Sequence, residues 1–441
     1  MRKAALHNLG CKVNAYESEA MRQLLKEAGY EIVAFREWAD VYIVNTCSVT
    51  NIADRKSRQM LHRAKKQNPE SVVVAAGCYV QSAAEELKKD LAVDIMIGNN
   101  KKKDLVLILE EYFRLHGGRE PEKTVSEHVI EIGSTKEYEG LHIENTADHT
   151  RAFIKVQDGC NQFCSYCIIP YTRGRVRSRS PQEVEREAAV LASRGYQEIV
   201  LTGIHLSSYG TDFEETSKED LLELIRRLHR IDGIVRIRLG SLEPGIITEE
   251  FVSALAGFPK VCPHFHLSLQ SGCDETLKRM NRHYTTKEYA DRCALLREKF
   301  SNPAITTDVI VGFPGESEEE FARTKAFLQE IRFYEMHIFK YSVRSGTRAA
   351  GMPDQVPETV KTQRSEELLS LERRMSLEYR QNFLRLPCQV LLEEGFRMGE
   401  TSYLIGHTRE YVKVAVLPEG QKTNTLVEVI PKKMLMEDIL L

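Results

Sequence analysis

Short apolar runs alternate with amphipathic stretches along the first part of the chain. Four of these runs have the length and composition of buried strands, at residues 3–9, 41–46, 72–77 and 93–98. Between the first two, residues 17–29 repeat apolar positions at helical spacing and end at a glycine, a common helix terminator. This alternation predicts an α/β fold with a doubly wound parallel sheet, covered by helices on both faces.

A second alternating series predicts six more strands, at residues 151–157, 198–205, 235–241, 264–270, 304–313 and 334–342. Helical patterns separate them, for example at residues 181–194 and 317–332. Six strand–helix units at this spacing predict a partial (βα)6 barrel, two units short of the eightfold barrel.

The end of the chain changes period after a long charged helix predicted at residues 360–384. Apolar and polar residues then alternate with a period of two in four short runs, at residues 388–395, 402–408, 411–417 and 425–431. This pattern predicts a small antiparallel β-barrel. We therefore expect an N-terminal domain at 1–118, a polar linker at 119–145, a barrel domain at 146–376 and a terminal domain at 377–441.

Composition narrows the protein class without identifying a function. The chain has 441 residues, 42% of them hydrophobic and 28% charged, which is typical of globular proteins. Its net charge of −3 does not indicate a basic nucleic-acid-binding domain, so any RNA contact requires a local patch. No apolar run reaches about 18 residues, and the first residues lack signal-peptide features. We expect a cytoplasmic protein without a membrane partner, and ten cysteines in such a chain favour metal ligands or catalytic thiols over disulfides.

Three cysteines cluster in the stretch "GCNQFCSYC", directly after the predicted strand at 151–157. Cys160, Cys164 and Cys167 have no fourth partner nearby, whereas structural zinc sites usually offer two pairs of ligands. Three thiolates would hold three irons of a [4Fe–4S] cluster and leave the fourth iron open to another ligand. The alternatives are a zinc site and three thiols that only pack in a loop.

A second set of three cysteines is dispersed. Cys11, Cys47 and Cys78 each follow a different predicted strand of the first domain. The carboxyl ends of parallel strands lie along one edge of a sheet, so these thiols are predicted to form a second three-cysteine site, with helix N-termini to stabilise negative charge. The alternative is that each cysteine packs at a strand end. The remaining cysteines share no such register and are interpreted as packing residues: Cys262, Cys273, Cys293 and Cys388.

Basic residues near the first cysteine set are candidates for RNA binding. Four arginines occupy alternate positions and would face one way in an extended segment: Arg173, Arg175, Arg177 and Arg179. Such a row would suit phosphates or a flipped base. The alternative is a solvated loop paired with the acidic helix that follows. In the terminal domain, Arg409 lies among basic and aromatic residues, compatible with single-stranded RNA binding and equally with an ordinary polar face.

The three clustered cysteines, with Tyr166 before the last one, match the radical S-adenosylmethionine (SAM) signature C-x3-C-x-aromatic-C. The whole chain resembles the radical SAM methylthiotransferases, from "NLGCKVNAYESEA" through "TGIHLSSYGTD" and "LSLQSGCDETLKRMNRHYT" to a terminal domain similar to a TRAM RNA-binding domain. Its motifs most resemble members that convert N6-threonylcarbamoyladenosine, 3′ of the tRNA anticodon, to its 2-methylthio derivative. Other members act on isopentenylated adenosine in tRNA or on a ribosomal-protein aspartate. An alternative of another class is a metal-stabilised RNA-binding protein without catalysis.

The resemblance implies two [4Fe–4S] clusters and two SAM molecules per turnover. The cluster on the "GCNQFCSYC" cysteines would bind SAM and generate a radical, and the cluster on the dispersed cysteines would hold the sulfur to be inserted. Further SAM contacts are implied for Tyr166, Ser268, Gln270 and Ile310. The implied partners are tRNA bearing N6-threonylcarbamoyladenosine, a low-potential electron donor such as flavodoxin or ferredoxin, and a sulfur source.

Overall fold

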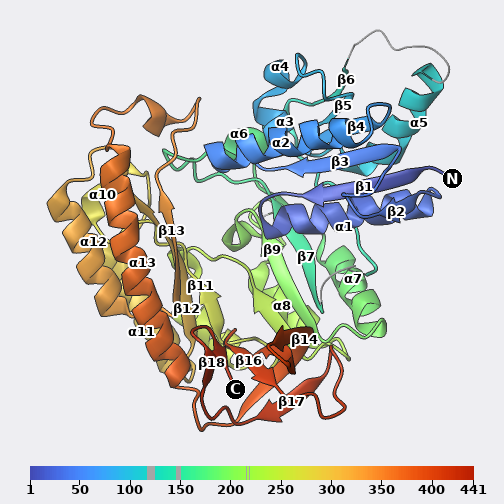
Figure 1. Cartoon of the computed structure of the whole chain (residues 1–441). Helices are drawn as coiled ribbons and strands as arrows, with labels where there is room; N and C mark the ends of the chain where they lie inside the picture. Colours follow the sequence, from blue (N-terminus) through green and yellow to red (C-terminus); the bar gives the residue numbers. More distant parts are fainter. Residues whose placement is uncertain (117–124, 146–149, 215, 218) are drawn as a thin grey trace.

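The computed structural model describes residues 1–116, 125–145, 150–214, 216–217 and 219–441. Its N-terminal domain is a six-stranded parallel sheet in the order β2-β1-β3-β4-β5-β6 (Figure 1). The strands are β1 (Lys3–Asn8), β2 (Glu31–Val33), β3 (Val41–Thr46), β4 (Val72–Gly77), β5 (Ile95–Ile97) and β6 (Ser126–His128). The helices are α1 (Lys12–Glu27), α2 (Asn51–Gln67), α3 (Cys78–Ser82), α4 (Ala84–Leu87) and α5 (Leu105–His116).

Alternate side chains of the central strands enter two separate cores. In β3, Val41 and Ile43 pack with α1 and α5, while Tyr42 and Val44 pack with α2 on the other face. Helices therefore cover both faces, as the predicted doubly wound sheet requires. The predicted linker at 119–145 is partly wrong, because β6 lies within it and extends this sheet by pairing with β5.

The central domain is a partial barrel. Its strands are β7 (Arg151–Asp158), β8 (Arg177–Ser178), β9 (Glu198–Gly203), β10 (Arg236–Leu239), β11 (His264–His266), β12 (Ala304–Val311) and β13 (Glu335–Lys340). They form two hydrogen-bonded groups, β10-β9-β7-β8 and β11-β12-β13, which isolated bridges join between residues 237 and 261 and between 242 and 267. All six predicted barrel strands are present and parallel, and β8 is a short antiparallel addition.

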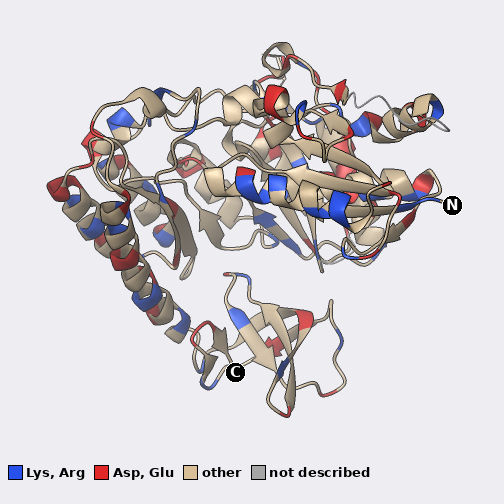
Figure 2. Ribbon diagram, turned by 45° about the horizontal axis from the view of Figure 1, so that its top comes forward, with Lys and Arg blue, Asp and Glu red and all other residues tan. Residues whose placement is uncertain are grey.

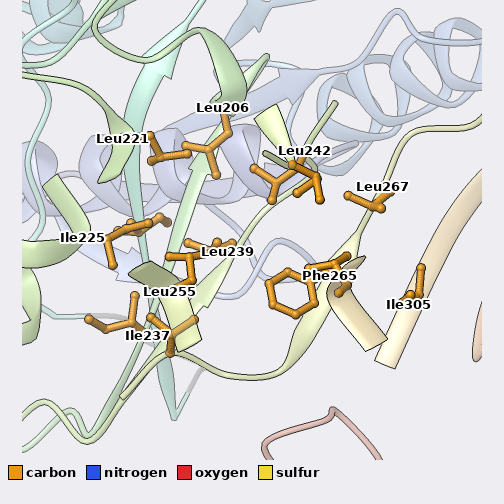
Figure 3. Close-up of a cluster of buried hydrophobic side chains, with 14 of the residues drawn as sticks. Leu206, Leu221, Ile225, Ile237, Leu239, Leu242, Leu255, Phe265, Leu267 and Ile305 are labelled. Carbon is orange, nitrogen blue, oxygen red and sulfur yellow. The ribbon is translucent and has the colours of Figure 1, made fainter. Parts of the chain in front are cut away.

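Helices surround the outside of this barrel: α7 (Pro181–Ser193), α8 (Leu221–His229), α9 (Glu249–Ala256), α10 (Asp274–Arg279), α11 (Thr286–Lys299), α12 (Glu318–Ile331) and α13 (Glu358–Gln381). The short helix α6 (Ile169–Arg173) packs against α3 of the N-terminal domain instead. Apolar side chains from every second strand position form the core beneath them (Figure 3), for example Ile237, Leu239, Phe265, Leu267 and Ile305. The intervening positions face the barrel lumen, and many of them are polar.

The terminal domain is a six-stranded sheet in the order β17-β14-β15-β16-β19-β18, antiparallel except for the β16–β19 pair. Its strands are β14 (Cys388–Met398), β15 (Thr401–His407), β16 (Lys413–Val416), β17 (Leu426–Val429), β18 (Met434–Met436) and β19 (Ile439–Leu440). Buried arginines of β10 attach it to the barrel: Arg236 donates to the carbonyl of His407 at 2.9 Å, and Arg238 to that of Arg409 at 2.8 Å. None of the helices within the described residues is both long and apolar enough to span a membrane.

Candidate active site

The loop that carries the first cysteine set follows β7 and is held by the segment after α10. The backbone N–H of Ser165 donates to the carbonyl of Met280 at 3.0 Å. The Asn281 side chain donates to the carbonyl of Phe163 at 3.1 Å, which supports the left-handed backbone of that residue (φ 48°). These contacts fix the loop between Cys160 and Cys167.

The thiols of this loop lie close together. Burial, reinforced by the neighbouring thiols, raises the pKa of Cys160 to about 11 and that of Cys167 to about 12. Arg282 donates to the sulfur of Cys164 at 3.2 Å. Hydrogen bonds to sulfur and a nearby cation stabilise thiolates, so the loop fits a cluster bound by three cysteines.

The second cysteine set lies at the carboxyl ends of β1, β3 and β4, which are neighbours in the N-terminal sheet. Cys11 precedes α1 and Cys78 begins α3. Burial and the charges of the other two thiols raise the pKa of Cys47 to about 12. Gly10 permits this approach, because a Cβ there would lie 2.8 Å from the Cys47 sulfur. The structure therefore brings the three dispersed cysteines together.

One arginine connects the two cysteine regions. Arg173 ends α6, the short helix that begins just after Cys167, and its Nε donates to the sulfur of Cys78 at 3.2 Å. Asn99 donates to the same sulfur at 3.6 Å. The Cys78 sulfur thus already accepts two hydrogen bonds, as a cluster ligand in a low-dielectric site would need.

Arg173 belongs to a fully buried group of charges. The two carboxylates and four cations of this group are Glu17, Asp158, Lys102, Lys155, Arg173 and Arg177. Glu17 is central, with ion pairs to Lys155 at 2.8 Å, to Arg173 at 2.8 Å and to Lys102 at 3.2 Å. The formal charge of the group is +2, which favours anionic sulfur beside it. Its members are far apart in sequence, and sequence analysis missed the group.

The predicted RNA-facing row of arginines is wrong for three of its four members. Arg173 and Arg177 are buried in the charged group, and Arg179 is buried against Glu187, with an ion pair of 2.6 Å. Arg175 is exposed, and its guanidinium lies 4.5 Å from the ring of Phe163. The physical reason is that the buried carboxylates Asp158 and Glu187 lie on the inner side of this segment, so that Arg177 in β8 and Arg179 after it pair inward, as Arg173 does at the end of α6.

Arg409 does not present a free guanidinium either. It donates to the carbonyls of Pro259 at 2.6 Å and of Val261 at 2.8 Å, so it attaches the terminal sheet to the barrel. The structure therefore gives Arg409 a role in domain docking, and its role in RNA binding stays a prediction.

Two of the predicted SAM-contact residues meet beside the cysteine loop. Tyr166 packs with Ile310 and Phe313 in one apolar cluster. Gln270 has a left-handed backbone (φ 71°), and its N–H donates to the carbonyl of Asp308 at 2.9 Å, which joins the end of β11 to β12. Ser268 lies just before it, at the same end of the barrel. The four residues thus lie at the carboxyl ends of the strands, where parallel α/β folds bind ligands.

Comparison with known proteins agrees with this architecture. Residues 154–328 match the radical SAM superfamily, and residues 3–98 match the uncharacterized protein family UPF0004. The threonylcarbamoyladenosine tRNA methylthiotransferase MtaB of Bacillus subtilis (strain 168) is 43% identical, over 94% of this chain and 90% of its own. The chain belongs to the radical SAM methylthiotransferase family. The predicted family and enzyme class are confirmed, and the family's cofactors are SAM and [4Fe–4S] clusters.

Other members of the methylthiotransferase family are also similar. A tRNA-2-methylthio-N(6)-dimethylallyladenosine synthase of Clostridium botulinum (strain Okra / Type B1) is 36% identical over 95% of this chain and 92% of its own. Among solved structures, the radical SAM methyltransferase TsrM of Kitasatospora setae, with cobalamin and a [4Fe–4S] cluster bound, has a TM-score of 0.58 at 16% identity. It covers 79% of this chain and 77% of its own, and at this identity it shows the fold alone.

Proposed function

We propose that this protein converts N6-threonylcarbamoyladenosine, 3′ of the anticodon in tRNA, into its 2-methylthio derivative. The observation that carries the proposal is the pair of three-cysteine sets, which α6 connects through the hydrogen bond from Arg173 to Cys78. The name of the Bacillus subtilis relative supports the choice of substrate. The Clostridium botulinum relative is named for dimethylallyladenosine, which makes that nucleoside the second candidate.

In this proposal each cysteine set holds one [4Fe–4S] cluster. Cys160, Cys164 and Cys167 leave one iron free for SAM, and the dispersed set of Cys11, Cys47 and Cys78 leaves one free for sulfur. When bound, the first cluster and SAM supply the radical chemistry that removes the C2 hydrogen of adenine, which no protein base at neutral pH removes. The chain itself positions these groups and excludes water.

The SAM-contact residues are assigned by their place beside the cysteine loop. Tyr166 and Ile310 form an apolar wall suited to the adenine of SAM, and Ser268 and Gln270 offer polar groups at the adjoining strand ends. Glu316 stabilises the turn after β12 and is not assigned as a SAM contact, because its side chain is buried and accepts a hydrogen bond from the Gly312 N–H at 2.6 Å.

The tRNA surface is proposed to follow α2, whose N-terminus lies just after Cys47. Exposed cations recur along this helix (Figure 2): Arg55, Lys56, Arg63 and Lys66. Such a row neutralises phosphates without reading sequence. Arg175 adds one exposed cation beside the first cysteine loop. We assign the terminal sheet, which resembles a TRAM domain, as a further RNA-binding element.

The remaining proposed partners follow from the chemistry. Reduction of the first cluster requires a low-potential donor such as flavodoxin or ferredoxin, and each inserted sulfur must come from a sulfur source. A tRNA-modifying enzyme of this kind would work in the cytoplasm.

The test compares three cysteine variants on anticodon stem–loops carrying the threonylcarbamoyl or the dimethylallyl nucleoside. We expect Cys164→Ala to abolish reductive SAM cleavage, and Cys47→Ala to retain it while transferring no sulfur. Cys388→Ala, outside both sets, should behave as the wild type. Nucleoside mass spectrometry and 5′-deoxyadenosine yield are the readouts.

Two results would contradict the proposal. Equal loss of SAM cleavage in Cys164→Ala and Cys47→Ala would remove the division of labour between the sets. Iron analysis after anaerobic purification should give roughly eight irons per chain, and zinc without sulfide would favour a non-catalytic RNA-binding protein. Methylthiolation of a ribosomal-protein aspartate and of neither RNA would identify the protein-directed alternative.

A further inference from the structure

The lumen of the barrel carries many polar side chains. In β10, β11, β12 and β13 most apolar residues face the helices, and Figure 3 shows several of them in that core. The positions between them carry charged or titratable side chains that face the lumen, among them Arg238, His266, Asp308 and His337. A barrel that only needed a stable interior would fill these positions with apolar side chains.

Three of these side chains gather at the middle of the lumen. His266, Asp308 and His337 come from the adjacent strands β11, β12 and β13, and their ligating atoms all lie within 4.8 Å of one another. The Nε2 of His266 lies 3.4 Å from a carboxylate oxygen of Asp308. That nitrogen is buried and makes no hydrogen bond within the described part of the chain. The group therefore has capacity for another polar partner.

The group is open to a ligand on the β13 side. His337 is exposed, and Phe339, two residues along the same face, is 44% exposed. The intervening side chains of β13, Met336 and Ile338, pack into the core instead. An accessible aromatic ring beside accessible polar groups is suited to a nucleobase with a polar substituent.

A lysine from the N-terminal domain reaches the same space. Lys12, at the start of α1, keeps an exposed side chain, but partial burial of its ammonium and the nearby cations Arg151 and Arg238 lower its pKa, while Asp308 raises it. Arg151 pairs with Glu393 at 3.2 Å, and Arg238 pairs with a buried glutamate of β9. Lys12 has no ion pair within the described residues, so it is the cation available to an anion from outside.

A metal ion fits this group less well than an anionic ligand. Two histidines and one carboxylate do match a common metal-binding set. However, the rings of His266 and His337 are stacked, with centroids 5.9 Å apart and planes at 25°. The uncompensated cation beside them also opposes a divalent ion.

We propose that Lys12, His266, Asp308 and His337 bind the threonylcarbamoyl group of the substrate adenosine. This inference rests on the function proposed above. Lys12 takes the carboxylate, Asp308 accepts from the ureido N–H groups, and the histidines hydrogen-bond the hydroxyl and the carbonyl. A dimethylallyl group offers none of these partners and would leave the polar groups of the lumen unpaired, so the site rejects it.

The test uses stem–loops that carry the threonylcarbamoyl nucleoside either with its carboxylate or as the neutral carboxamide. We expect the wild type to prefer the carboxylate at least about 10-fold in kcat/KM, because a charge-assisted hydrogen bond is lost in the amide. Lys12→Met should reduce this preference to below about 3-fold. Lys103→Met, which changes an exposed lysine elsewhere, should keep it.

Two further variants separate this role from damage to the neighbouring cluster. His337→Leu and Asp308→Asn lie on barrel strands and should weaken both threonylcarbamoyl substrates. His337→Leu removes no charge that acts on Lys12 and should leave the carboxylate-to-amide ratio unchanged. Affinity is measured without turnover, by fluorescence anisotropy of labelled stem–loops, and iron content verifies that each variant holds its clusters.

The possible failures are distinguishable. If the wild type modifies neither stem–loop, the proposed function itself is wrong. If it modifies the carboxylate and amide forms equally well, and Lys12→Met changes neither, only the present inference is overturned. Stoichiometric zinc in the wild type that is lost in Asp308→Asn would also overturn it, in favour of a metal site.

Discussion

Glu17 is the residue whose change tests most directly how the buried charges hold the site. It is fully buried on α1 and pairs with Lys102, Lys155 and Arg173. Within the described residues it is the only ion-pair partner of Lys102, which is fully buried as well. In Glu17→Gln the Lys102 ammonium keeps only its 2.6 Å hydrogen bond to Asn99.

The expected cost follows from the buried charge. Removing one partner of a buried ion pair costs about 3–5 kcal/mol, because the remaining charge stays desolvated without compensation. In a domain of this size each kcal/mol shifts Tm by about 2–4 °C, so Glu17→Gln should lower Tm by about 6–20 °C. Glu27→Gln, on the same helix but exposed, should change stability by no more than about 0.5 kcal/mol.

The measurement is thermal unfolding by circular dichroism across a range of pH. Burial alone would raise the pKa of Glu17, but the surrounding cations hold it well below its ordinary value of 4.5. Its contribution to stability is therefore fully present above that ordinary value and is lost as pH falls toward the depressed pKa. We expect the difference in Tm between the wild type and Glu17→Gln to stay constant at neutral pH and to narrow in acid.

Two results would refute this reasoning. A fall in Tm no larger than that of Glu27→Gln would show that the buried charges are hydrated or rearrange freely. The double variant Glu17→Gln/Lys102→Met removes the orphaned cation, and should recover a substantial part of the loss. No recovery would mean that the loss came from packing and not from charge.

Three further predictions follow from other contacts. Reversing the charge of Arg55 and Lys56 in α2 should weaken tRNA binding about 10-fold or more at low salt and reduce the salt dependence of binding. SAM cleavage should not change. Unchanged tRNA affinity in a binding titration would exclude α2 as the tRNA surface. Arg344→Ala removes a largely buried ion pair to Asp54 (2.6 Å) and should therefore increase amide hydrogen exchange where the N-terminal domain meets the barrel. Unaltered exchange there would contradict this prediction. Arg236→Met removes hydrogen bonds that dock the terminal sheet on the barrel, and should therefore increase amide hydrogen exchange in that sheet. Equal exchange in the wild type and the variant would argue against a docking role for Arg236.

Strands that consist of an uninterrupted run of buried apolar residues were predictable. Residues 72–77 are apolar and buried on both faces, and the prediction matches β4 residue for residue. β2 and β6 were not predicted, because they have three residues each, too few to stand out as an apolar or alternating run. Their pairing depends on the sheet beside them, which a local pattern does not contain.

The cysteine sets were predictable because each follows a strand, and parallel strands end along one edge. The arginine row was not, because Arg173 and Arg177 pair with Glu17 and Asp158, and the first of these carboxylates is remote in sequence. The polar lumen was also missed. Alternating apolar and polar residues, as around Arg238, predict a strand whose polar side faces solvent. Only closure of the barrel turns that polar side toward the lumen.

The attachment of the terminal domain has a consequence for protein engineering. Tyr411 lies under two lumen arginines, with its ring 4.8 Å from the guanidinium of Arg151 and 4.8 Å from that of Arg238. Deleting the terminal domain would therefore remove the carbonyl partners of Arg236 and Arg238 and would damage the catalytic barrel itself. Exchange of this domain between relatives should succeed only when the β10 arginines are exchanged with it.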